Sequence, residues 1–141
     1  MKSAVKDEPV VVLDACALIA YCNDEAGAEV VSAALQDVRH IWISGVNLLE
    51  IAYDAVKRTG DATSALRVME MVSELPLQIH WHLDPEMIIS AAGFKARFRI
   101  SMADAVALAL AAKYGAPVMT CDHHEFDPIE KSGQARFLWI R

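Results

Sequence analysis

Short apolar runs alternate with longer stretches of helical periodicity along the chain. Five runs are rich in β-branched or aromatic residues and predict strands, at residues 10–13, 41–44, 77–81, 118–121 and 137–140. Helical patterns separate these strands, which is the arrangement of a parallel sheet covered on both faces. The pattern therefore predicts an α/β fold, a three-layer sandwich whose central, mainly parallel sheet of about five strands is flanked by helices.

The expected helices are marked by caps and breakers. Helices are predicted at residues 15–21, at 24–39 with Asn23 or Asp24 as cap and Val30, Ala34, Leu35 and Val38 on one face, at 62–75, at 85–98 after Asp84, and at 101–114 with Ser101 as cap. A further helix, closed by Gly60, carries an expected apolar stripe of Val46, Leu49, Tyr53 and Val56. The segment HHEFDP is expected to form a turn.

The bulk properties indicate one compact domain over residues 1–141. Hydrophobic residues make up 55% of the chain and charged residues 23%, a balance that excludes a disordered protein. The net charge is −6, so the overall field should repel a nucleic acid. Two bound divalent ions would change the net charge to −2 and remove most of this repulsion of a nucleic acid.

The three cysteines, Cys16, Cys22 and Cys121, suggest neither a disulfide framework nor a zinc site, because their number is odd and no ligand-pair spacing is present. A reducing cytoplasm is the expected location. The segment MKSAVKDEP is charged where a signal peptide would be apolar, and no run has the roughly 20 apolar residues of a membrane span. We therefore expect no membrane association.

Four acidic residues stand where a predicted strand ends or a predicted helix begins. Asp14 and Asp122 follow strands, while Glu50 and Asp104 lie in early turns of helices. In right-handed parallel α/β units the helix N-termini lie at the edge where the strands end. All four side chains are therefore expected to face one crevice, with Glu50 pointing along the sheet margin and away from bulk water.

Each acid also has a purely structural interpretation. Asp14 and Asp122 can cap the helices that follow them, and Ser101 with Asp104 forms the capping-box pattern SMAD. Convergence of all four favours a shared cation, since crowded carboxylates repel one another unless a positive charge neutralises them. Oxygen ligands favour Mg²⁺ or Mn²⁺, and two such ions roughly 4 Å apart can support hydrolysis of a phosphodiester.

Three segments resemble the PIN-domain nucleases, and most closely the VapC-like toxins of bacterial toxin–antitoxin (VapBC) pairs. They are VVVLDACALIAY, SGVNLLEIAYD and ISMADAVALALAAKYGAPVMTCDHHEF, in the family's order and in a chain of the family's usual length. The resemblance implies that Asp14, Glu50, Asp104 and Asp122 bind Mg²⁺ or Mn²⁺ and position the water that cuts RNA. It also implies a homodimer and a cognate antitoxin as protein partner.

Two cysteines depart from the family pattern. Many members carry Ser or Thr soon after the first acid, where this chain has Ala15 and Cys16, and Cys121 precedes the fourth acid where small or hydroxyl residues are common. Cys16 and Cys121 can make the site sensitive to oxidation, or be inert buried thiols, which is the more ordinary role. Thr120 and Ser101 can orient a ligand or serve backbone capping alone.

Histidine and basic residues near the acids leave alternatives open. His123 and His124 follow Asp122 and can touch substrate or act as a general acid, although a loop surface is the simpler interpretation. Lys95, Arg97 and Arg99 form a basic patch that can hold an RNA backbone or be an ordinary solvated helix end.

Three functions compete on this sequence. The leading one is a metal-dependent endoribonuclease that acts as a toxin; the second is a PIN-like module that binds RNA or protein without cutting. The third is a Mg²⁺-dependent phosphatase, which would require a second Asp two residues after the first, where this chain has Cys16. RNA cleavage by the purified protein separates the first from the other two.

Overall fold

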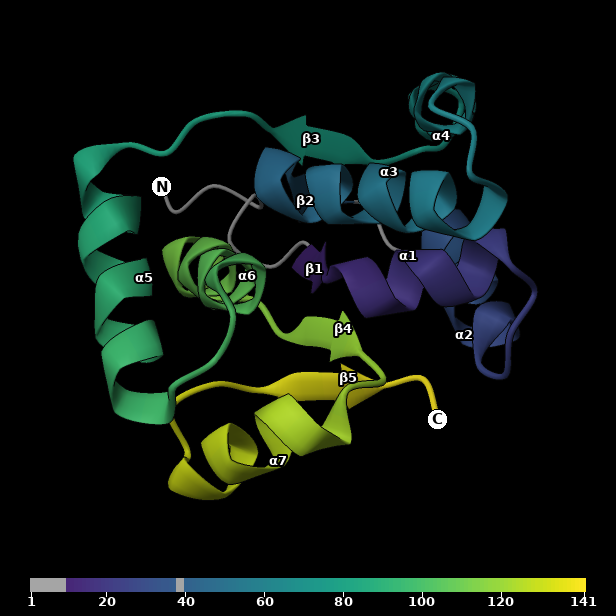
Figure 1. Ribbon diagram of the computed structural model, residues 1–141. Helices are drawn as coiled ribbons and strands as arrows, with labels where there is room; N and C mark the ends of the chain where they lie inside the picture. Colours follow the sequence, from purple (N-terminus) through teal and green to yellow (C-terminus); the bar gives the residue numbers. More distant parts are fainter. Residues whose placement is uncertain (1–9, 38–39) are drawn as a thin grey trace, which may run out of the picture.

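A five-stranded sheet forms the centre of the computed structural model, which describes residues 10–37 and 40–141. The strands are β1 (Val10–Leu13), β2 (His40–Ser44), β3 (Gln78–His80), β4 (Val118–Thr120) and β5 (Phe137–Trp139). Their order across the sheet is β3-β2-β1-β4-β5, and every neighbouring pair is parallel. The predicted α/β class and parallel sheet are confirmed (Figure 1).

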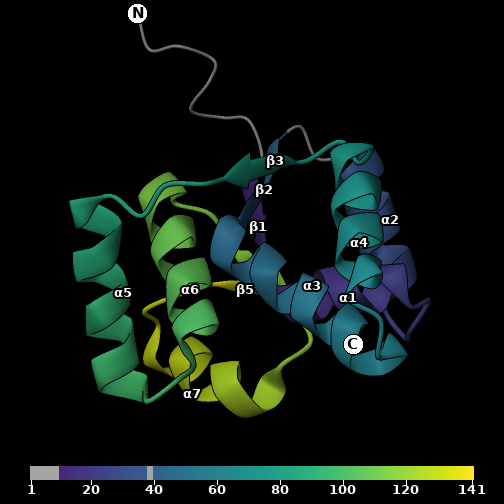
Figure 2. The ribbon, with the colours of Figure 1, turned by 45° about the horizontal axis from the view of Figure 1, so that its top comes forward.

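Seven helices in the described part of the chain cover the two faces of this sheet. They are α1 (Ala15–Cys22), α2 (Ala28–Asp37), α3 (Gly45–Thr59), α4 (Thr63–Ser73), α5 (Pro85–Phe98), α6 (Met102–Tyr114) and α7 (His123–Ser132). Figures 1 and 2 show α1 to α4 on one side and α5 to α7 on the other. None of the helices in the described residues is both long and apolar enough to cross a membrane.

Alternating side chains of the central strand divide the core in two. Leu13 of β1 packs with α1 to α4, whereas Val12 packs with α5 to α7, and both side chains are fully buried. A strand covered on both faces needs apolar residues at every position, which explains why β1 is a continuous apolar run, VVVL. The sheet therefore separates two cores, and its edge is where polar groups can gather.

The helix ends follow the capping chemistry of the sequence at several predicted positions. Asp84 accepts a hydrogen bond from the Met87 amide at 2.9 Å, and Pro85 opens α5 behind it. The Ser101 hydroxyl accepts from the Asp104 amide at 3.1 Å, which fixes the start of α6. Gly60 ends α3 with a left-handed backbone, as expected of a C-terminal glycine.

The start of α2 was predicted wrongly. Asn23 is the C-terminal cap of α1 and not the N-terminal cap of α2, and Asp24 has a positive φ of 52°. A turn through Gly27, whose φ is 95°, delays the helix to Ala28. Capping residues favour both helix ends and turns, so their type alone did not locate the break. Val38 and Arg39, predicted to complete this helix, lie outside the described residues.

Two further predictions are corrected by the structure. The segment HHEFDP begins α7 and is not a turn, because Asp122 caps the helix and Phe126 and Ile129 are fully buried beneath it. In α3 the buried residues are Asn47, Leu48 and Ile51, while Leu49 and Tyr53 of the predicted stripe are 69% and 61% exposed. This helix has apolar residues on two faces, and periodicity did not reveal which one meets the sheet.

We expect Gly27→Ala to destabilise the protein more than Gly60→Ala. Both glycines have a positive φ, but an added Cβ at Gly27 would lie 2.6 Å from the backbone oxygen of Ile140, whereas nothing lies within 4 Å at Gly60. The Gly60 variant should lose about 1 kcal/mol from backbone strain alone. Unfolding in urea measures both free energies, and equal losses would contradict the close packing of Gly27 against Ile140.

Candidate functional site

A pocket of about 440 Å³ opens at the edge where β1 and β4 end and α3 and α6 begin. All four acids singled out in the sequence line it, and α1 and the loop before α2 complete its wall. The lining residues are Asp14, Ala15, Cys16, Ile19, Glu25, Glu50, Tyr53, Asp54, Lys57, Arg58, Ser101, Asp104, Asp122 and Glu125. The parallel topology therefore brings together four acids of which the first and last, Asp14 and Asp122, are 108 positions apart in the sequence.

Asp14 is the most deeply buried acid of the pocket, with only 1% of its surface exposed. It follows β1 and caps α1: one carboxyl oxygen accepts from the Ala17 amide at 2.9 Å. The other accepts from the Thr120 hydroxyl at 2.6 Å. The pKa of Asp14 is raised to about 7, mainly by burial and further by the charges of Asp104 and Asp122, although the two hydrogen bonds lower it.

Asp104 lies in the first turn of α6, where every residue from Asp104 to Ala111 is buried. Burial raises its pKa to about 7, although a side-chain hydrogen bond with Ser101 acts in the opposite direction. The neighbouring charges of Asp122, Glu50 and Glu125 add to the increase. The capping geometry at Ser101 and the placement of Asp104 in the pocket are thus compatible.

Asp122 and Glu50 lie nearer to solvent than Asp14 and Asp104. Asp122 caps α7 by accepting from the Glu125 amide at 3.1 Å, and its own amide donates to the Thr120 hydroxyl at 3.0 Å. Glu50 lines the pocket as expected, but its side chain reaches solvent more than the sequence predicted. Partial burial, followed by the charges of Asp122 and Asp54, raises the pKa of Glu50.

A buried asparagine that the sequence analysis did not single out joins the two helices that carry Glu50 and Asp104. Asn47 is fully buried, and its side-chain amide donates to the Ala103 carbonyl at 3.3 Å. Its oxygen accepts from the Ser44 hydroxyl at 2.5 Å. The sequence signal that could have identified Asn47 is its polar side chain within SGVNLLE, three residues before Glu50. Asn47 sets how closely the N-terminus of α3 approaches that of α6.

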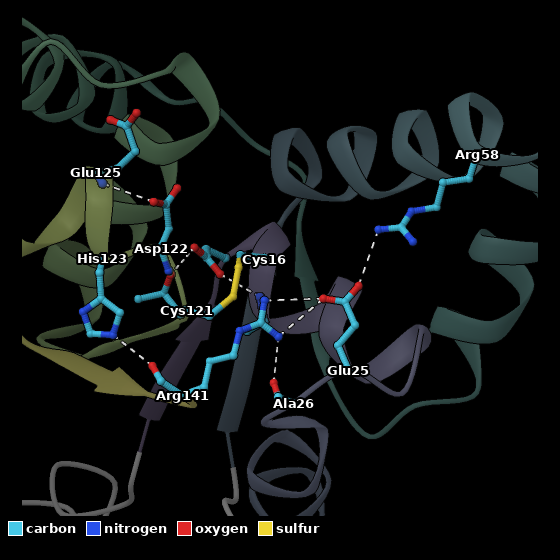
Figure 3. Close-up of a disulfide and its surroundings, with 12 residues drawn as sticks. Cys16, Glu25, Ala26, Arg58, Cys121, Asp122, His123, Glu125 and Arg141 are labelled. Carbon is cyan, nitrogen blue, oxygen red and sulfur yellow. Dashed lines mark hydrogen bonds and ion pairs between the residues drawn. A yellow bond between two sulfur atoms is a disulfide. The ribbon is translucent and has the colours of Figure 1, made fainter.

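The mouth of the pocket carries an ion-pair network whose long-range pairs, from Glu25 to Arg58 and to Arg141, cannot be predicted from sequence spacing. Arg58 bonds Asp54 at 2.9 Å and Glu25 at 3.4 Å, and Arg141 reaches the same Glu25 at 3.4 Å. Figure 3 shows Glu25 between the two arginines. Lys57 also lines the pocket and makes no ion pair with any described residue. The acidic pocket therefore has basic groups at its rim.

A disulfide joins Cys16 to Cys121 in the wall of the pocket (Figure 3), contrary to the expectation from cysteine number and spacing. The two residues are 105 positions apart, with Cα atoms separated by 6.1 Å. They meet because Cys16 follows β1, Cys121 follows β4, and these strands are neighbours in the sheet. The remaining cysteine, Cys22, is a free thiol and is exposed.

The two candidate histidines lie outside the pocket lining. His123 pairs with Asp127 at 2.9 Å, contacts the Arg141 carbonyl at 2.9 Å through its second ring nitrogen, and stacks on Trp139. These contacts give it a structural role. His124 is exposed and does not line the pocket.

The basic patch of α5 is likewise absent from the pocket lining. Lys95 donates to the Ile100 carbonyl at 2.7 Å, and the Arg97 guanidinium lies over the rings of Phe94 and Phe98. These contacts fit a packed helix end better than a surface held open for RNA.

A five-stranded parallel sheet with an acidic pocket at its carboxyl edge defines a parallel α/β protein whose site is built from carboxylates. The PIN-domain family model matches residues 11–131. The chain belongs to the PIN-domain family, which confirms the resemblance seen in the sequence. A comparison with curated proteins gives no match.

Solved structures share this fold at low sequence identity. A chain of a toxin–antitoxin complex from Klebsiella pneumoniae matches with a TM-score of 0.71 and 16% identity, over 93% of this chain and 98% of that one. A chain of VapBC-1 from nontypeable Haemophilus influenzae gives 0.67 and 17%, over 93% and 98%. VapC20 of Mycobacterium tuberculosis, described as a sarcin-ricin loop cleaving toxin, gives a TM-score of 0.66 and 14%, over 84% and 94%.

The chemistry of the pocket fits the divalent cation that PIN nucleases use. Its donors are carboxylate oxygens, and the raised pKa values of Asp14 and Asp104 reflect burial and mutual repulsion that a cation would relieve. Among the described residues, however, no three His, Cys, Asp or Glu side chains are arranged closely enough to hold a metal ion. Binding would therefore require carboxylates to turn toward a common point.

We expect the metal-free protein to lose stability as the pH rises from about 4 to 7. The carboxyls of Asp14 and Asp104 have pKa values raised from 3.8 to about 7, so the folded protein holds protons that the unfolded chain releases. Their contribution is complete below about pH 4 and is lost as the pH rises through 7, at up to roughly 1.4 kcal/mol per pH unit for each carboxyl.

Asp104→Asn should reduce this pH dependence, because it keeps the shape of the side chain and removes one of the titrating groups. Thermal unfolding in EDTA at several pH values measures the effect. Parallel pH curves for the variant and the original protein would contradict the raised pKa of Asp104.

Proposed function

We propose that the protein is a Mg²⁺- or Mn²⁺-dependent endoribonuclease and the toxin of a toxin–antitoxin pair, with residues 1–141 acting as one domain. The observation that carries this proposal is the convergence of Asp14, Glu50, Asp104 and Asp122 in one pocket at the carboxyl edge of a PIN-type sheet. Isolated helix caps would not need to share a pocket, and four crowded carboxylates offer nothing to a protein that only binds RNA.

The four acids would hold the cation and the attacking water. When bound, a divalent cation activates water and stabilises the negative charge that develops on a phosphodiester. Asp14, held at both oxygens by Ala17 and Thr120, provides a fixed ligand. Asp104 provides the second buried carboxylate, and Asp122 and Glu50, nearer to solvent, orient water on the open side.

Basic groups at the mouth give an RNA backbone a place to bind in an acidic protein. Lys57 has no ion-pair partner among the described residues, so its ammonium group is free to contact a phosphate. Arg58 is held by Asp54 and Glu25 and presents its charge from the same helix. Together with bound divalent cations, these two basic groups would offset part of the repulsion expected from the net charge of −6.

The proposal of an antitoxin partner is supported by the neighbouring structures and by the surface of the chain. Several neighbours are described as toxin–antitoxin or VapBC complexes. Tyr53 lines the pocket, and Leu49 of α3 and Leu66 of α4 are exposed as well, each of the three being more than 60% accessible. Exposed apolar groups of this size are typical of a protein-binding surface, and an antitoxin bound here would cover the pocket mouth.

A homodimer and a cytoplasmic location also belong to the proposal. The exposed side chains of Trp81, Ile88 and Ile89 provide apolar surface just after β3 and in the first turns of α5. Figure 2 shows α5 on the opposite side of the molecule from α4. The oligomeric state in solution can be measured by light scattering.

We expect the purified protein to cut RNA with Mg²⁺ or Mn²⁺, and EDTA to stop the cleavage. Asp104→Asn and Asp14→Asn should each lower the rate by roughly a hundredfold or more, since each removes a carboxylate from the cation that carries several kcal/mol of transition-state stabilisation. Gel analysis of a labelled structured RNA measures the rates.

Asp37→Asn is the matched control, because Asp37 is an exposed carboxylate at the end of α2 that does not line the pocket. Its rate should equal that of the original protein. Cleavage that survives both EDTA and the Asp104 substitution would disprove the proposed site.

Induced expression should arrest growth only when Asp14 and Asp104 are intact, and co-expression of a cognate antitoxin should restore growth.

A further inference from the structure

We propose that Cys16 and Cys121 are a reversible thiol-oxidation site that sets how tightly the acidic pocket holds a divalent cation, with the disulfide form binding the cation more tightly. The cation part of this inference rests on the proposed function. The existence of the oxidation site rests on the structure of the pocket wall alone.

Both cysteines occupy the turns that carry acids of the pocket. Cys16 stands two residues after Asp14, in the first turn of α1, and lines the pocket. Cys121 stands between β4 and Asp122. Their disulfide therefore links the backbone segments of two acids that come from opposite ends of the chain, as Figure 3 shows for Cys121 and Asp122.

Asp14 does not depend on the disulfide for its position. Its amide donates to the Met119 carbonyl at 3.2 Å, and its carboxylate accepts from Thr120 at 2.6 Å, so two hydrogen bonds already hold it against β4. Both of these contacts are made by residues of β4, Met119 and Thr120. The segment that follows, Cys121 and Asp122, has left the strand and belongs to no helix until His123.

The disulfide is the covalent link between that segment and α1. Without it, the connection from Asp122 to Asp14 runs through the Thr120 hydroxyl, which accepts from the Asp122 amide and donates to Asp14, while the capping bond between Asp122 and Glu125 lies on its own side of the pocket. Two unbonded sulfur atoms also need roughly 3.5 to 4 Å between them, against about 2 Å when bonded. Reduction should therefore move or loosen Asp122 relative to Asp14 and weaken a cation held by both.

Reduction and re-formation of the disulfide each balance in atoms and electrons with reagents that cells contain, a dithiol reductant and hydrogen peroxide. A dithiol reductant supplies two electrons and two protons: the sulfur–sulfur bond breaks, two protein thiols form, and the reductant becomes a disulfide. In the reverse direction one thiolate attacks hydrogen peroxide to give a sulfenic acid and, with a proton, one water. The second thiol then attacks the sulfenic sulfur, closing the disulfide and releasing a second water.

Both sulfurs are placed to react. Cys16 and Cys121 are half-buried and not sealed in the core, and the pocket beside Cys16 opens to solvent. In a reducing cytoplasm the dithiol form would prevail, and an oxidant would raise the cation affinity. Cys22 is exposed at the end of α1, does not line the pocket, and serves as an internal control.

The test compares the full-length protein after treatment with dithiothreitol and after treatment with hydrogen peroxide, each reagent being removed. Alkylation under denaturing conditions followed by intact mass should add three groups to the reduced protein and one, on Cys22, to the oxidised protein. Calorimetric titration with Mn²⁺ should show roughly tenfold weaker binding to the reduced form, comparable to the loss of outer-shell support at other metal sites.

The double substitution Cys16→Ser and Cys121→Ser should bind Mn²⁺ like the reduced protein and ignore the oxidant, whereas Cys22→Ser should respond as the original protein does. Three alkylated thiols after oxidation, or equal Mn²⁺ affinities in the two redox forms, would overturn the inference. The comparison of redox forms needs no variant, so poor folding of the double variant would not remove the test.

The outcome is separable from that of the proposed function. Thiol counts and Mn²⁺ affinities are measured without RNA. A protein that binds Mn²⁺ in a redox-dependent way but cuts no RNA would refute the nuclease and leave the oxidation site standing. A protein that cuts RNA with equal Mn²⁺ affinity in both forms would refute the oxidation site alone.

Discussion

The parallel pairing of β1 with β4 is the constraint on which the site depends. These strands come from opposite ends of the chain, and their pairing brings Asp14 and Asp122 to the same edge of the sheet. Thr120 joins the two acids directly, because its hydroxyl donates to the Asp14 carboxylate and accepts from the Asp122 amide. A single buried hydroxyl thus positions two acids, and replacing it with an apolar group would leave Asp14 buried with one hydrogen bond fewer.

The same edge concentrates negative charge where solvation is poor. Asp14 and Asp104 are buried because the helices that carry them must bury their apolar faces against the sheet, so folding and charge repulsion oppose each other in this pocket. Proteins accept such a conflict mainly where function requires it. The raised pKa values express the cost, and a divalent cation is the means by which a PIN-type pocket would offset it.

Much of this arrangement was predictable from the sequence. Asp14, Asp104 and Asp122 stand beside strands and caps whose patterns are unambiguous, and the topology of parallel α/β units then places them at one edge. The phase of α3 was not predictable, since Leu49 and Leu48 are equally apolar and only packing decides which is buried. The disulfide was also not predictable, because the pairing of Cys16 with Cys121 follows from strand order, which spacing along the chain does not encode.

The network of Glu25 with Arg58 and Arg141 ties three distant segments of the chain around the pocket mouth. Its members are partly exposed, with 30% to 53% of each side chain accessible, so each pair contributes at most about 1 kcal/mol and is screened by salt. Rising ionic strength should therefore weaken the pairing of Glu25 with both arginines, while the backbone hydrogen bonds of Glu25 with Ala20 and Ala28 keep the loop in place.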